Sequence, residues 1–404
     1  MQNGGLLVFN GGSSSLKFTL FESDSEGEGA ALRARIRGQI ERIARGPSLV
    51  MDAVAETAGA SEKRLAEKHW PQTATPSETE MLAVLIELLD KHLQTPLRAA
   101  GHRIVHGGLF HAESTFVDAA VLAQLEATVP LAPLHLPHNI APIRALAQLH
   151  PQLPQVGCFD TGFHTTIPRV ARLFGLPREL ADQGILRYGF HGLSYAYIAS
   201  QLIHIDQRAA RGRTIVAHLG NGASVCALVN SKSVATSMGF SALEGLVMGT
   251  RCGNLDPGVL IYLLRERDYD AKSIEQLLYH DSGLLGLSGI SSDMRDLLAS
   301  DAEAACEAVD VFVYRVVREI GSMVAAAGGI DALVFTGGIG EHAAPIRAAV
   351  CAQLRWLGIE LCEAANAQNA QRLHADNSAI GVWRLPTDEE VVIARETQRL
   401  LSQR

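Results

Sequence analysis

The sequence predicts an α/β protein made of two similar halves, and three observations support this fold class. Four apolar, strand-like runs lie within residues 6–56, and helical patterns follow them. The strand pattern begins again at residues 214–230, before further helical stretches. The segments LLVFNGGSSSLKFTLF and TIVAHLGNGASVCALVN also share one layout, in which a turn of Gly and Asn ending in Ser joins two apolar strands. They lie about half a chain length apart, as a duplicated domain would place them, and no shorter repeat indicates a solenoid.

Periodicity predicts the elements in chain order. Strands are expected at residues 6–9, 15–21, 33–40 and 48–56, followed by a helix at 81–94, a short strand at 101–106 and a helix at 139–150. In the second half, strands are expected at 214–219 and 223–230, and helices near 257–267, 302–327, 345–356 and 388–402. The acidic segment ESDSEGEGA and other turn-rich pieces separate the early strands.

Composition excludes several classes of protein. The 404 residues are 47% apolar and 19% charged, which is enough to build sizeable cores. The net charge of −8 and the lack of a basic block with interleaved aromatic residues argue against nucleic acid or an anionic membrane as partner. Neither a secretory leader nor an apolar run long enough to span a bilayer is visible, so we expect a cytoplasmic protein. The six cysteines form no CxxC pair, which favours free thiols over a metal cluster or disulfides.

Three Gly-rich turns are candidate phosphate-binding segments: NGGSSS at residues 10–15, HLGNGAS at 218–224 and TGGIGEH at 336–342. Turns of Gly, Ser and Asn carry little side-chain bulk, so their N–H groups can approach a polyphosphate closely. The alternative is an ordinary hairpin, because Asn-Gly is a common hairpin signal. Residue order excludes a P-loop, a Rossmann fingerprint, a G-x-S-x-G elbow and an H-E-x-x-H zinc helix.

Charged and titratable residues in polar surroundings are the candidates for chemistry. Arg103 in HRIVHGG ends a strand-like segment, where a guanidinium suits capture of a carboxylate or phosphate. Asp160 in GCFDTGFH ends an apolar strand, where side chains of α/β sheets commonly face a ligand. His191 lies between Phe and Gly in RYGFHG. The plain alternatives are a structural salt bridge for Arg103 and a core histidine for His191.

Two further candidates lie at predicted helix starts. Arg251 precedes a helix that begins at Asp256 and Pro257, and a loop arginine there could neutralise charge on a transferring phosphoryl group. Glu389 lies in TDEE, which also matches a capping box with Thr387 as N-cap and the acid three residues later as its partner. On that alternative, Glu389 is only a first-turn carboxylate.

Eight ordered blocks between residues 10 and 397 resemble one family, the acetate kinases with their relatives the propionate and butyrate kinases. The blocks are NGGSSSLK, HRIVHGG, FDTGFH, RYGFHG, HLGNGAS, TSMGF with LEGLVMGTRCG, FTGGIGE and TDEEVVIARET. These kinases belong to the superfamily of sugar kinases, heat-shock chaperones and actin. The resemblance implies two duplicated ribonuclease-H-like domains with a nucleotide cleft between them, the first covering residues 1–150 and 385–404 and the second 151–384.

The resemblance also implies a role for individual residues. The catalytic residues would be Asp160, His191 and Arg251, and the ligands of Mg²⁺ or Mn²⁺ would be Asn10 and Glu389. The substrate carboxylate would bind Arg103, and its alkyl end would contact Val105, Leu134, Phe190 and Ala242. The residues in contact with ATP or ADP would be Lys17, His218, Leu219, Gly220, Asn221, Gly222, Asp293, Met294, Arg295, Gly337, Gly338, Ile339, Gly340 and Glu341. The family also implies a homodimer.

The activity implied by the resemblance is reversible, ATP-dependent phosphorylation of acetate, and of propionate, to the acyl phosphate by direct in-line transfer. A short carboxylic acid has a pKa near about 4, so the acceptor is ionised at neutral pH and needs no general base. Asp160 is therefore expected to orient an arginine or metal-bound water rather than to accept a proton. Two alternatives remain: a kinase of the same superfamily with a hydroxyl acceptor, which would need a base, and a non-catalytic nucleotide switch.

The sequence departs from the usual family pattern at five positions. Asn254 and Ala235 stand where Asp is usual, Tyr195 where His is common, Asp388 where Asn is usual, and Ala242 where the family has the Pro of TPLEG. The last position lines the pocket for the substrate's alkyl end. We expect Ala242 to leave room for about one or two further methylenes, so that propionate or butyrate is accepted better than by a typical acetate kinase.

Overall fold

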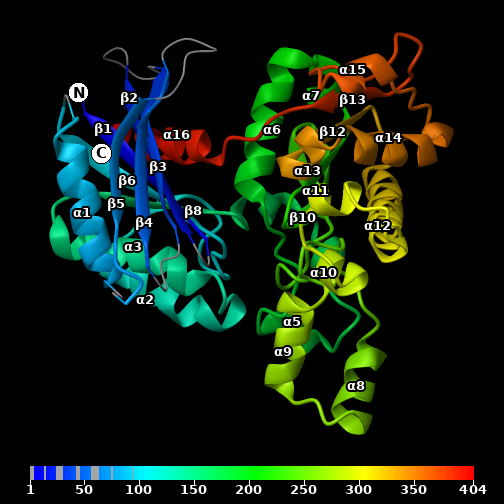
Figure 1. Cartoon of the computed structure of the whole chain (residues 1–404), viewed down its shortest axis with the longest axis horizontal. Helices are drawn as coiled ribbons and strands as arrows, with labels where there is room; N and C mark the ends of the chain where they lie inside the picture. The colour runs from blue at the N-terminus through cyan, green and yellow to red at the C-terminus, as the bar shows by residue number, and fades with distance from the viewer. Residues whose placement is uncertain are drawn as a thin grey trace. The chain divides into compact units, whose positions relative to one another are not determined.

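The computed structural model describes residues 4–12, 15–23, 31–41, 46–55, 63–73, 76–93 and 95–404. The chain forms two compact units, one of Met1–Gly162 with Asp388–Arg404 and one of Phe163–Thr387, and each is built around its own sheet (Figure 1). The predicted α/β class is confirmed. Across the described ranges, no helix is long and apolar enough to cross a membrane.

The first unit is built on a sheet that has eight strands among the described residues, in the order β5-β4-β3-β2-β1-β6-β8-β7. The strands are β1 (Gly5–Gly11), β2 (Ser15–Ser23), β3 (Leu32–Glu41), β4 (Ser48–Ala53), β5 (Lys63–His69), β6 (Leu97–Ile104), β7 (Thr115–Phe116) and β8 (Gln155–Phe159). The pairs from β1 to β5 are antiparallel, whereas β6 runs parallel to β1 and β8 runs parallel to β6.

Helices cover both faces of this sheet. They are α1 (Glu78–Asp90), α2 (Ala119–Thr128), the short 3-10 turn η1 (Val129–Leu131), α3 (Leu136–Leu149) and α16 (Glu389–Ser402). Apolar residues of α1 and α3 pack on one face in a core shared with β1 to β4. On the opposite face, α16 lies so close to β6 that a Cβ at Gly101 would be 2.5 Å from Thr397 Oγ1 and 2.6 Å from Ile393 Cγ2. Glycine at this position therefore lets α16 pack directly on the sheet.

The second unit has a sheet of five described strands in the order β11-β10-β9-β12-β13. The strands are β9 (Arg213–Leu219), β10 (Ala223–Val229), β11 (Lys232–Thr236), β12 (Ala332–Thr336) and β13 (Gly381–Arg384). The helices are α4 (Arg169–Arg172), α5 (Arg178–Asp182), α6 (Gly192–Ile205), α7 (Gln207–Arg211), α8 (Pro257–Glu266), α9 (Ala271–His280), α10 (Gly283–Ser288), α11 (Met294–Leu298), α12 (Glu303–Ala327), α13 (Gly337–His342), α14 (Ala344–Gln353) and α15 (Glu363–Ala367), with 3-10 turns η2 (Gly162–Thr166) and η3 (Arg355–Leu357).

The two sheets share one plan. In each, three antiparallel strands (β1–β3 and β9–β11) are joined by two strands that run parallel to the first (β6 and β8, β12 and β13). The β1–β2 turn and the β9–β10 turn therefore occupy equivalent places. This result confirms the two similar halves that the shared layout of these segments predicts.

The junctions between the units differ from the boundaries expected from sequence. Residues 151–162 were assigned to the second domain, but β8 pairs with β6 in the first sheet, so this segment belongs to the first unit. At the other end, the first unit resumes at Asp388, three residues later than the expected start at residue 385. Strand pairing decides the first position, and the second lies directly before α16.

A neutral histidine is built into the core of the first sheet. His102 in β6 is 1% exposed, and its ring stacks on Phe9 with the centroids 5.3 Å apart. Burial lowers the pKa of His102 to about 3, well below its ordinary value. Below about pH 6.5 the unfolded chain therefore binds a proton that the folded chain does not bind, so acid lowers the free energy of unfolding.

We predict that His102→Leu makes the stability of the protein less sensitive to acid. Between pH 6 and pH 4 the free energy of unfolding of the wild type should fall relative to the variant by about 1.4 kcal/mol per pH unit, because one proton is taken up on unfolding. Urea unfolding followed by circular dichroism at several pH values measures this difference. The exposed His204, changed to Leu, is the control and should follow the wild type; parallel curves for His102→Leu would contradict the prediction.

Candidate active site

Three strands of the first sheet end at one edge with a polar side chain each. Asn10 lies near the carboxyl end of β1, Arg103 lies near that of β6, and Asp160 directly follows β8. Because these strands run parallel, their carboxyl ends meet. Arg103 Nη1 donates to Asn10 Oδ1 at 3.1 Å, and Arg103 Nη2 and Nε donate to Asp160 Oδ2 at 2.7 and 3.1 Å. Three residues that are distant in sequence thus form one cluster.

The charges of this cluster hold one another in place. The side chain of Asp160 is 1% exposed and that of Arg103 is 18% exposed. Burial works against the charge of Arg103, but the attraction of Asp160 and Glu389 outweighs it and raises the pKa of the guanidinium above its ordinary value. Arg103 is therefore a fixed positive charge, and the contact with Asp160 sets the plane of its guanidinium group.

Helix α16 adds a second carboxylate to the cluster. The helix begins at Glu389, whose Oε2 accepts a hydrogen bond from Asn10 Nδ2 at 3.1 Å and lies 3.5 Å from Arg103 Nη1. The side chain of Glu389 is 12% exposed. The sequence prediction that Asn10 and Glu389 serve one ligand thus has support in their contact, and their role stays a prediction.

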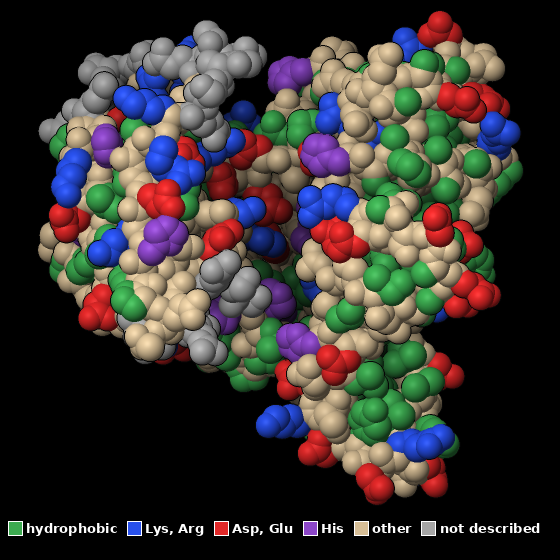
Figure 2. Space-filling model, in the orientation of Figure 1, with side chains coloured by type: hydrophobic (Ala, Val, Ile, Leu, Met, Phe, Trp, Pro, Cys, Tyr) green, Lys and Arg blue, Asp and Glu red, His purple; other side chains and the backbone are tan. Residues whose placement is uncertain are grey.

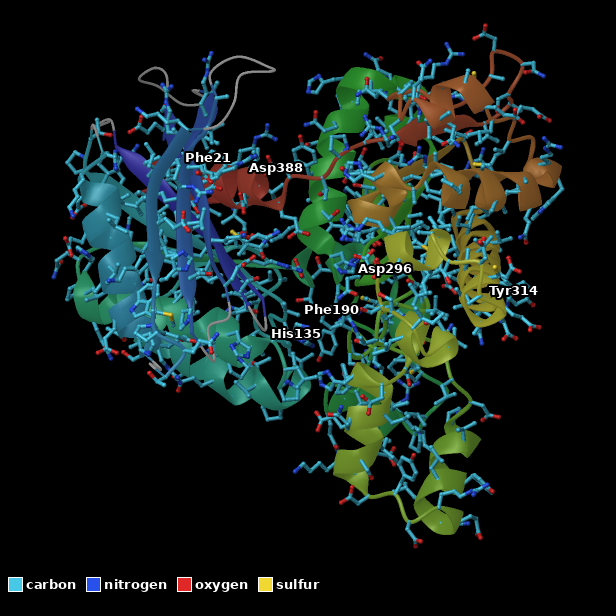
Figure 3. All side chains as sticks on the ribbon, viewed as in Figure 1. Phe21, His135, Phe190, Asp296, Tyr314 and Asp388 are labelled. Carbon is cyan, nitrogen blue, oxygen red and sulfur yellow. The ribbon has the colours of Figure 1, made fainter. Side chains whose placement is uncertain are left out.

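The start of α16 differs from the capping box expected from TDEE. Asp388, labelled in Figure 3, is the N-cap, and its Oδ1 accepts from Val391 N at 3.0 Å. The expected pair of Thr387 as N-cap and Glu390 as its partner is wrong, because Glu390 accepts instead from Thr19 Oγ1 in β2 at 2.5 Å. Asp388 performs the cap that the family's usual Asn would also supply.

The Gly-rich β1–β2 turn has a polar side and an apolar side. Lys17 pairs with Asn10 across the two strands, so these side chains share one face of the sheet, and Lys17 is exposed. Ser13 and Ser14, which we expected to face phosphates, lie outside the described residues. The available geometry agrees with Lys17 as an anion ligand, and this role remains a prediction.

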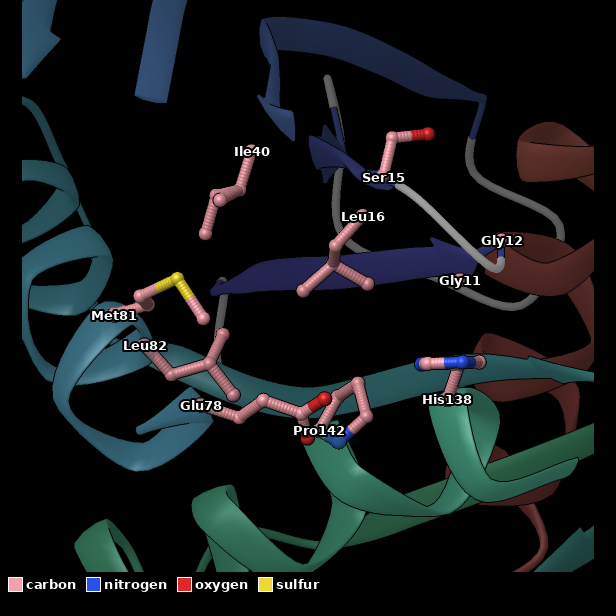
Figure 4. Close-up of a pocket in the computed structure, with 10 residues that line it drawn as sticks. All are labelled: Gly11, Gly12, Ser15, Leu16, Ile40, Glu78, Met81, Leu82, His138 and Pro142. Carbon is pink, nitrogen blue, oxygen red and sulfur yellow. The ribbon is translucent and has the colours of Figure 1, made fainter. Parts of the chain in front are cut away.

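On its other side the same turn borders an apolar pocket (Figure 4). The pocket is lined by Gly11, Gly12, Ser15, Leu16, Ile40, Glu78, Met81, Leu82, His138 and Pro142. Its lining residues include no Lys or Arg, and burial raises the pKa of Glu78, so these surroundings disfavour a negative charge. This pocket is therefore unsuited to a phosphate group.

Asn139 of α3 is a positioning residue that the sequence analysis missed. It is 2% exposed, its Oδ1 accepts from Val105 N at 3.0 Å, and its Nδ2 donates to Gly11 O at 3.0 Å. One side chain thereby ties the end of β1 to the segment that follows β6. The only signal in the sequence is an amide between apolar residues of a helix, which does not reveal its partners.

In the second unit, the Gly-rich β9–β10 turn lies beside the start of α13, a short helix at the place where the sequence predicted a third Gly-rich turn. The β9–β10 turn contains the predicted nucleotide ligands His218 to Gly222, and Gly337 to Glu341 follow β12. Gly337 has φ 77°, and a Cβ there would lie 2.7 Å from Leu219 O. Only glycine adopts this conformation at such a short approach without strain. The two predicted segments therefore come together in one backbone surface.

A buried arginine contacts the last turn of α13. Arg347 of α14 is 0% exposed, and its five N–H groups donate to five neutral oxygens at 2.6–2.9 Å. The acceptors are Gly340 O, Glu341 O, Asn366 Oδ1, Asn366 O and Asn369 Oδ1. Arg347 was not predicted as a site residue, and its described bonds tie residues 340 and 341 to the 366–369 segment.

The carboxylate of Glu341 bonds back to the first residue of α13. Its Oε1 accepts from Gly337 N at 3.0 Å and from Thr387 N at 3.3 Å, and its side chain is 14% exposed. These bonds hold the start of α13, and the predicted contact of Glu341 with the nucleotide stays a prediction.

The third predicted nucleotide segment is the start of α11. Asp293 is the N-cap of this helix, and its carboxylate accepts from the guanidinium of Arg295 at 2.6 Å. Hydrogen bonds from Arg295 lower the pKa of Asp293 to about 2. Arg295 is 89% exposed, and Met294 is buried. Within the second unit, Arg295 is thus the member of this segment most able to reach a ligand.

His191 and Arg251 meet over the β9–β10 turn. A Cβ at Gly222 would lie 2.7 Å from Arg251 Nη2 and 3.4 Å from His191 Nε2. The His191 ring also stacks on the ring of His218, with the centroids 4.3 Å apart, and His218 Nδ1 lies 2.9 Å from Ser194 Oγ. Two of the predicted catalytic residues thus lie beside the same glycine of this unit.

The residues expected at the alkyl end of a substrate are divided between the units. Val105, 5% exposed, and the half-buried Leu134 belong to the first unit. Phe190, labelled in Figure 3 and 2% exposed, and the half-buried Ala242 belong to the second. Their common role in one pocket stays a prediction.

Known proteins resemble this chain over nearly its whole length. The model of the acetokinase family matches residues 5–395. The acetate kinase of Rhodopseudomonas palustris strain CGA009 is 51% identical over 399 residues, which cover 98% of each protein. The acetate kinase of Rhizobium meliloti is 45% identical over 397 residues, again 98% of each protein.

Solved structures agree with these relatives. The propionate kinase of Francisella tularensis subsp. tularensis SCHU S4 matches with a TM-score of 0.88 at 35% identity, over 98% of this chain and 99% of that one. The acetate kinase of Porphyromonas gingivalis matches with a TM-score of 0.85 at 34% identity, over 98% and 100% of the two chains. Both confirm the actin-like ATPase fold with duplicated domains that the motifs predict. The chain therefore belongs to the acetokinase family and is a phosphotransferase with a carboxyl group as acceptor.

Proposed function

We propose that this chain transfers the γ-phosphoryl group of ATP to acetate, and to propionate, and forms the acyl phosphate reversibly. The observation that carries the proposal is the guanidinium of Arg103, a fixed positive charge oriented by the 1% exposed Asp160 at the carboxyl edge of the first sheet. A guanidinium held in this way attracts and orients a small carboxylate. The identity of the relatives as acetate kinases supports the choice of acetate.

In the proposed reaction, an oxygen of the carboxylate attacks the γ-phosphorus while the bond from phosphorus to the ADP oxygen breaks. Both reactants are anionic, so the main requirement is compensation of charge rather than removal of a proton. Arg103 of the first unit and Arg251 of the second supply positive charge, and His191 supplies a further polar contact.

A divalent cation is the expected partner of the nucleotide. Mg²⁺ in such enzymes commonly has one or two protein ligands and completes its shell with phosphate oxygens and water. Asn10 Oδ1 and the carboxylate of Glu389 lie beside each other, joined by the bond from Asn10 Nδ2, and both are oxygen ligands of the kind that Mg²⁺ prefers. We propose that these two residues hold Mg²⁺, which would neutralise charge on the phosphates.

A kinase with a hydroxyl acceptor fits the first cluster less well. Such an enzyme needs a carboxylate that accepts the proton of the hydroxyl group. Asp160 receives two hydrogen bonds from Arg103, and a carboxylate stabilised in its ionised form is a weak base. This pairing favours the carboxylate acceptor.

We predict acetohydroxamate formation when the protein is incubated with ATP, MgCl₂, acetate and hydroxylamine. Arg103→Ala should lower the rate by about 10³-fold, because a charge opposite the reacting anions is lost. The exposed Arg144, which pairs with Glu126, is the matched control, and Arg144→Ala should retain the wild-type rate. Because the buried Asp160 loses its partner in Arg103→Ala, circular dichroism must show that this variant is folded. Arg103→Lys, which keeps a positive charge beside Asp160, is the second variant. No product with any short acid would overturn the proposal.

The acyl pocket should be wider than is usual in the family. The carbonyl oxygen of Ala242 accepts from Arg251 Nη1 at 2.6 Å, so the 241–245 loop is held against a predicted catalytic residue. Gly245 N donates to Asn254 Oδ1 at 2.9 Å, a contact that the family's usual Asp would also make. Asn at position 254 therefore keeps the hydrogen bond to the 241–245 loop. The small side chain at position 242 is the change that bears on substrate size.

We predict that kcat/KM for propionate is within about fourfold of that for acetate, because one buried methylene is worth about 0.8 kcal/mol. Ala242→Pro should lower the ratio of propionate to acetate by about fourfold or more, and Ala242→Gly, which adds no bulk, should leave it unchanged. Steady-state kinetics with acetate, propionate and butyrate measure these ratios. A drop of about 100-fold from acetate to propionate in the wild type would contradict the prediction.

We propose a homodimer formed through α8 of the second unit. None of the residues in α8 is buried, and Val259, Ile261, Tyr262 and Leu264 are each 40–51% exposed. Figure 2 shows hydrophobic side chains gathered over this region. A second copy is the proposed occupant because exposed apolar helices of this kind are commonly covered in symmetric dimers.

Analytical ultracentrifugation should therefore give the mass of a dimer. The double variant Ile261→Glu and Leu264→Glu should sediment as a monomer, because charge would be buried in the interface. Trp356, 71% exposed on η3, is the control, and Trp356→Glu should remain dimeric. A monomeric wild type, or a dimeric double variant, would exclude this interface.

We also propose a cytoplasmic location. The six cysteines are free thiols, as the sequence predicts, and such thiols are typical of a reducing compartment. The supply of ATP as co-substrate agrees with the same location.

A further inference from the structure

Two buried hydroxyl groups form a hydrogen-bonded chain with the ring of His191. The hydroxyl oxygen of Tyr195 lies 2.5 Å from Ser224 Oγ, and Ser224 Oγ lies 2.8 Å from His191 Nδ1. Tyr195, near the start of α6, and Ser224, in β10, are both 0% exposed. Bulk water therefore does not compete for these hydroxyl groups, and the chain of bonds must satisfy its own hydrogens.

The backbone fixes the ring of His191 against this chain. His191 is the N-cap of α6 and has φ 57° and ψ 25°, a left-handed conformation that is rare for a residue with a side chain. The ring of His218 stacks on it from β9. The position of Nδ1 relative to Ser224 is thus set by the main chain and by packing on the ring face.

Counting hydrogens gives the direction of the bonds. If Tyr195 donates to Ser224, then the hydroxyl hydrogen of Ser224 is directed to Nδ1 of His191, and every hydrogen in the chain is bonded. If instead Nδ1 carries a proton and donates to Ser224, one hydroxyl hydrogen, of either Ser224 or Tyr195, has no acceptor within the chain. A buried donor without an acceptor is unfavourable. The first arrangement is therefore the stable one, and the neutral ring then carries its proton on Nε2.

We propose that Tyr195 and Ser224 are positioning residues that hold His191 as the neutral imidazole with its proton on Nε2. Nε2 lies on the side of Gly222 where Arg251 Nη2 is also found. There the N–H group would donate a hydrogen bond to an oxygen of the transferring phosphoryl group, beside the charge of Arg251. This last role rests on the proposed function, whereas the position of the proton does not.

The residue at 195 distinguishes this chain from the usual family pattern, in which a histidine is common. Desolvation by burial raises the pKa of Tyr195 well above its ordinary value, so the phenol keeps its hydrogen and must donate it. An imidazole at the same place can present a bare nitrogen to Ser224, and the chain of bonds can then run in either direction. Tyr195→His is therefore the change that should release the constraint on His191.

The test is a ¹⁵N NMR spectrum of the protein labelled at its histidine rings, recorded at pH 7. The signals of His191 are assigned by their loss in His191→Gln. In the wild type we expect a bare Nδ1 and a protonated Nε2. Tyr195→Phe is the matched control and should keep this form, because the hydrogen of Ser224 still needs Nδ1, whereas Tyr195→His should show a second form with protonated Nδ1.

The spectra decide the inference separately from activity. A wild-type His191 with a proton on Nδ1, or a spectrum of Tyr195→His identical to that of the wild type, would overturn it. If the expected spectra are obtained but no acyl hydroxamate forms from any short acid, the proposed function fails while the assignment of the proton stands. A merely structural role for Tyr195 would alter thermal stability in both variants and would leave the position of the proton unchanged.

Discussion

The parallel pairing of the inner strands is the constraint on which both candidate clusters depend. β6 and β8 follow β1 in the same direction in the first sheet, and β12 follows β9 in the second. Carboxyl ends of parallel strands meet at one edge, so Arg103 contacts Asn10 and Asp160, which are 93 and 57 residues away in the sequence. The same rule brings Gly337 against Leu219 in the second unit. One strand plan, used twice, therefore creates two places where polar groups gather.

The two units hold a buried guanidinium in opposite ways. Arg103 faces carboxylates, and its pKa is raised above the ordinary value. Arg347 donates to neutral oxygens alone, and desolvation lowers its pKa to about 10. The charge of Arg103 is thus partly compensated within its cluster, whereas that of Arg347 is spread over neutral groups beside α13. A positive charge beside this Gly-rich segment favours an anion nearby, which agrees with a phosphate site there.

The sequence predicted the fold class and elements such as β1, β2, β9, β10 and α12, because apolar periodicity and Gly-rich turns are local signals, but it missed helices such as α2, α6 and α9. It also predicted Arg103, Asp160 and Glu389, which the structure brings together with Asn10. Asn139 was missed because its bonds run to the main chain of distant segments, and Arg347 was missed because its acceptors are main-chain and Asn oxygens that no local pattern pairs with it. The helix cap at 388 was misread for a related reason. A capping box needs an acid three residues after the N-cap that accepts a hydrogen bond from the N-cap backbone. The carboxylate of Glu390 accepts a hydrogen bond from Thr19 in β2 instead.

The departures from the family pattern around His191 have one physical feature in common. Asn254 keeps the hydrogen bond of the usual Asp through its Oδ1 and loses the charge. Tyr195 keeps a donor in place of a histidine and, with its raised pKa, does not ionise near neutral pH. Each replacement thus leaves a hydrogen-bonding side chain that carries no charge at neutral pH. Hydrogen bonds from uncharged groups then set the position of the His191 ring.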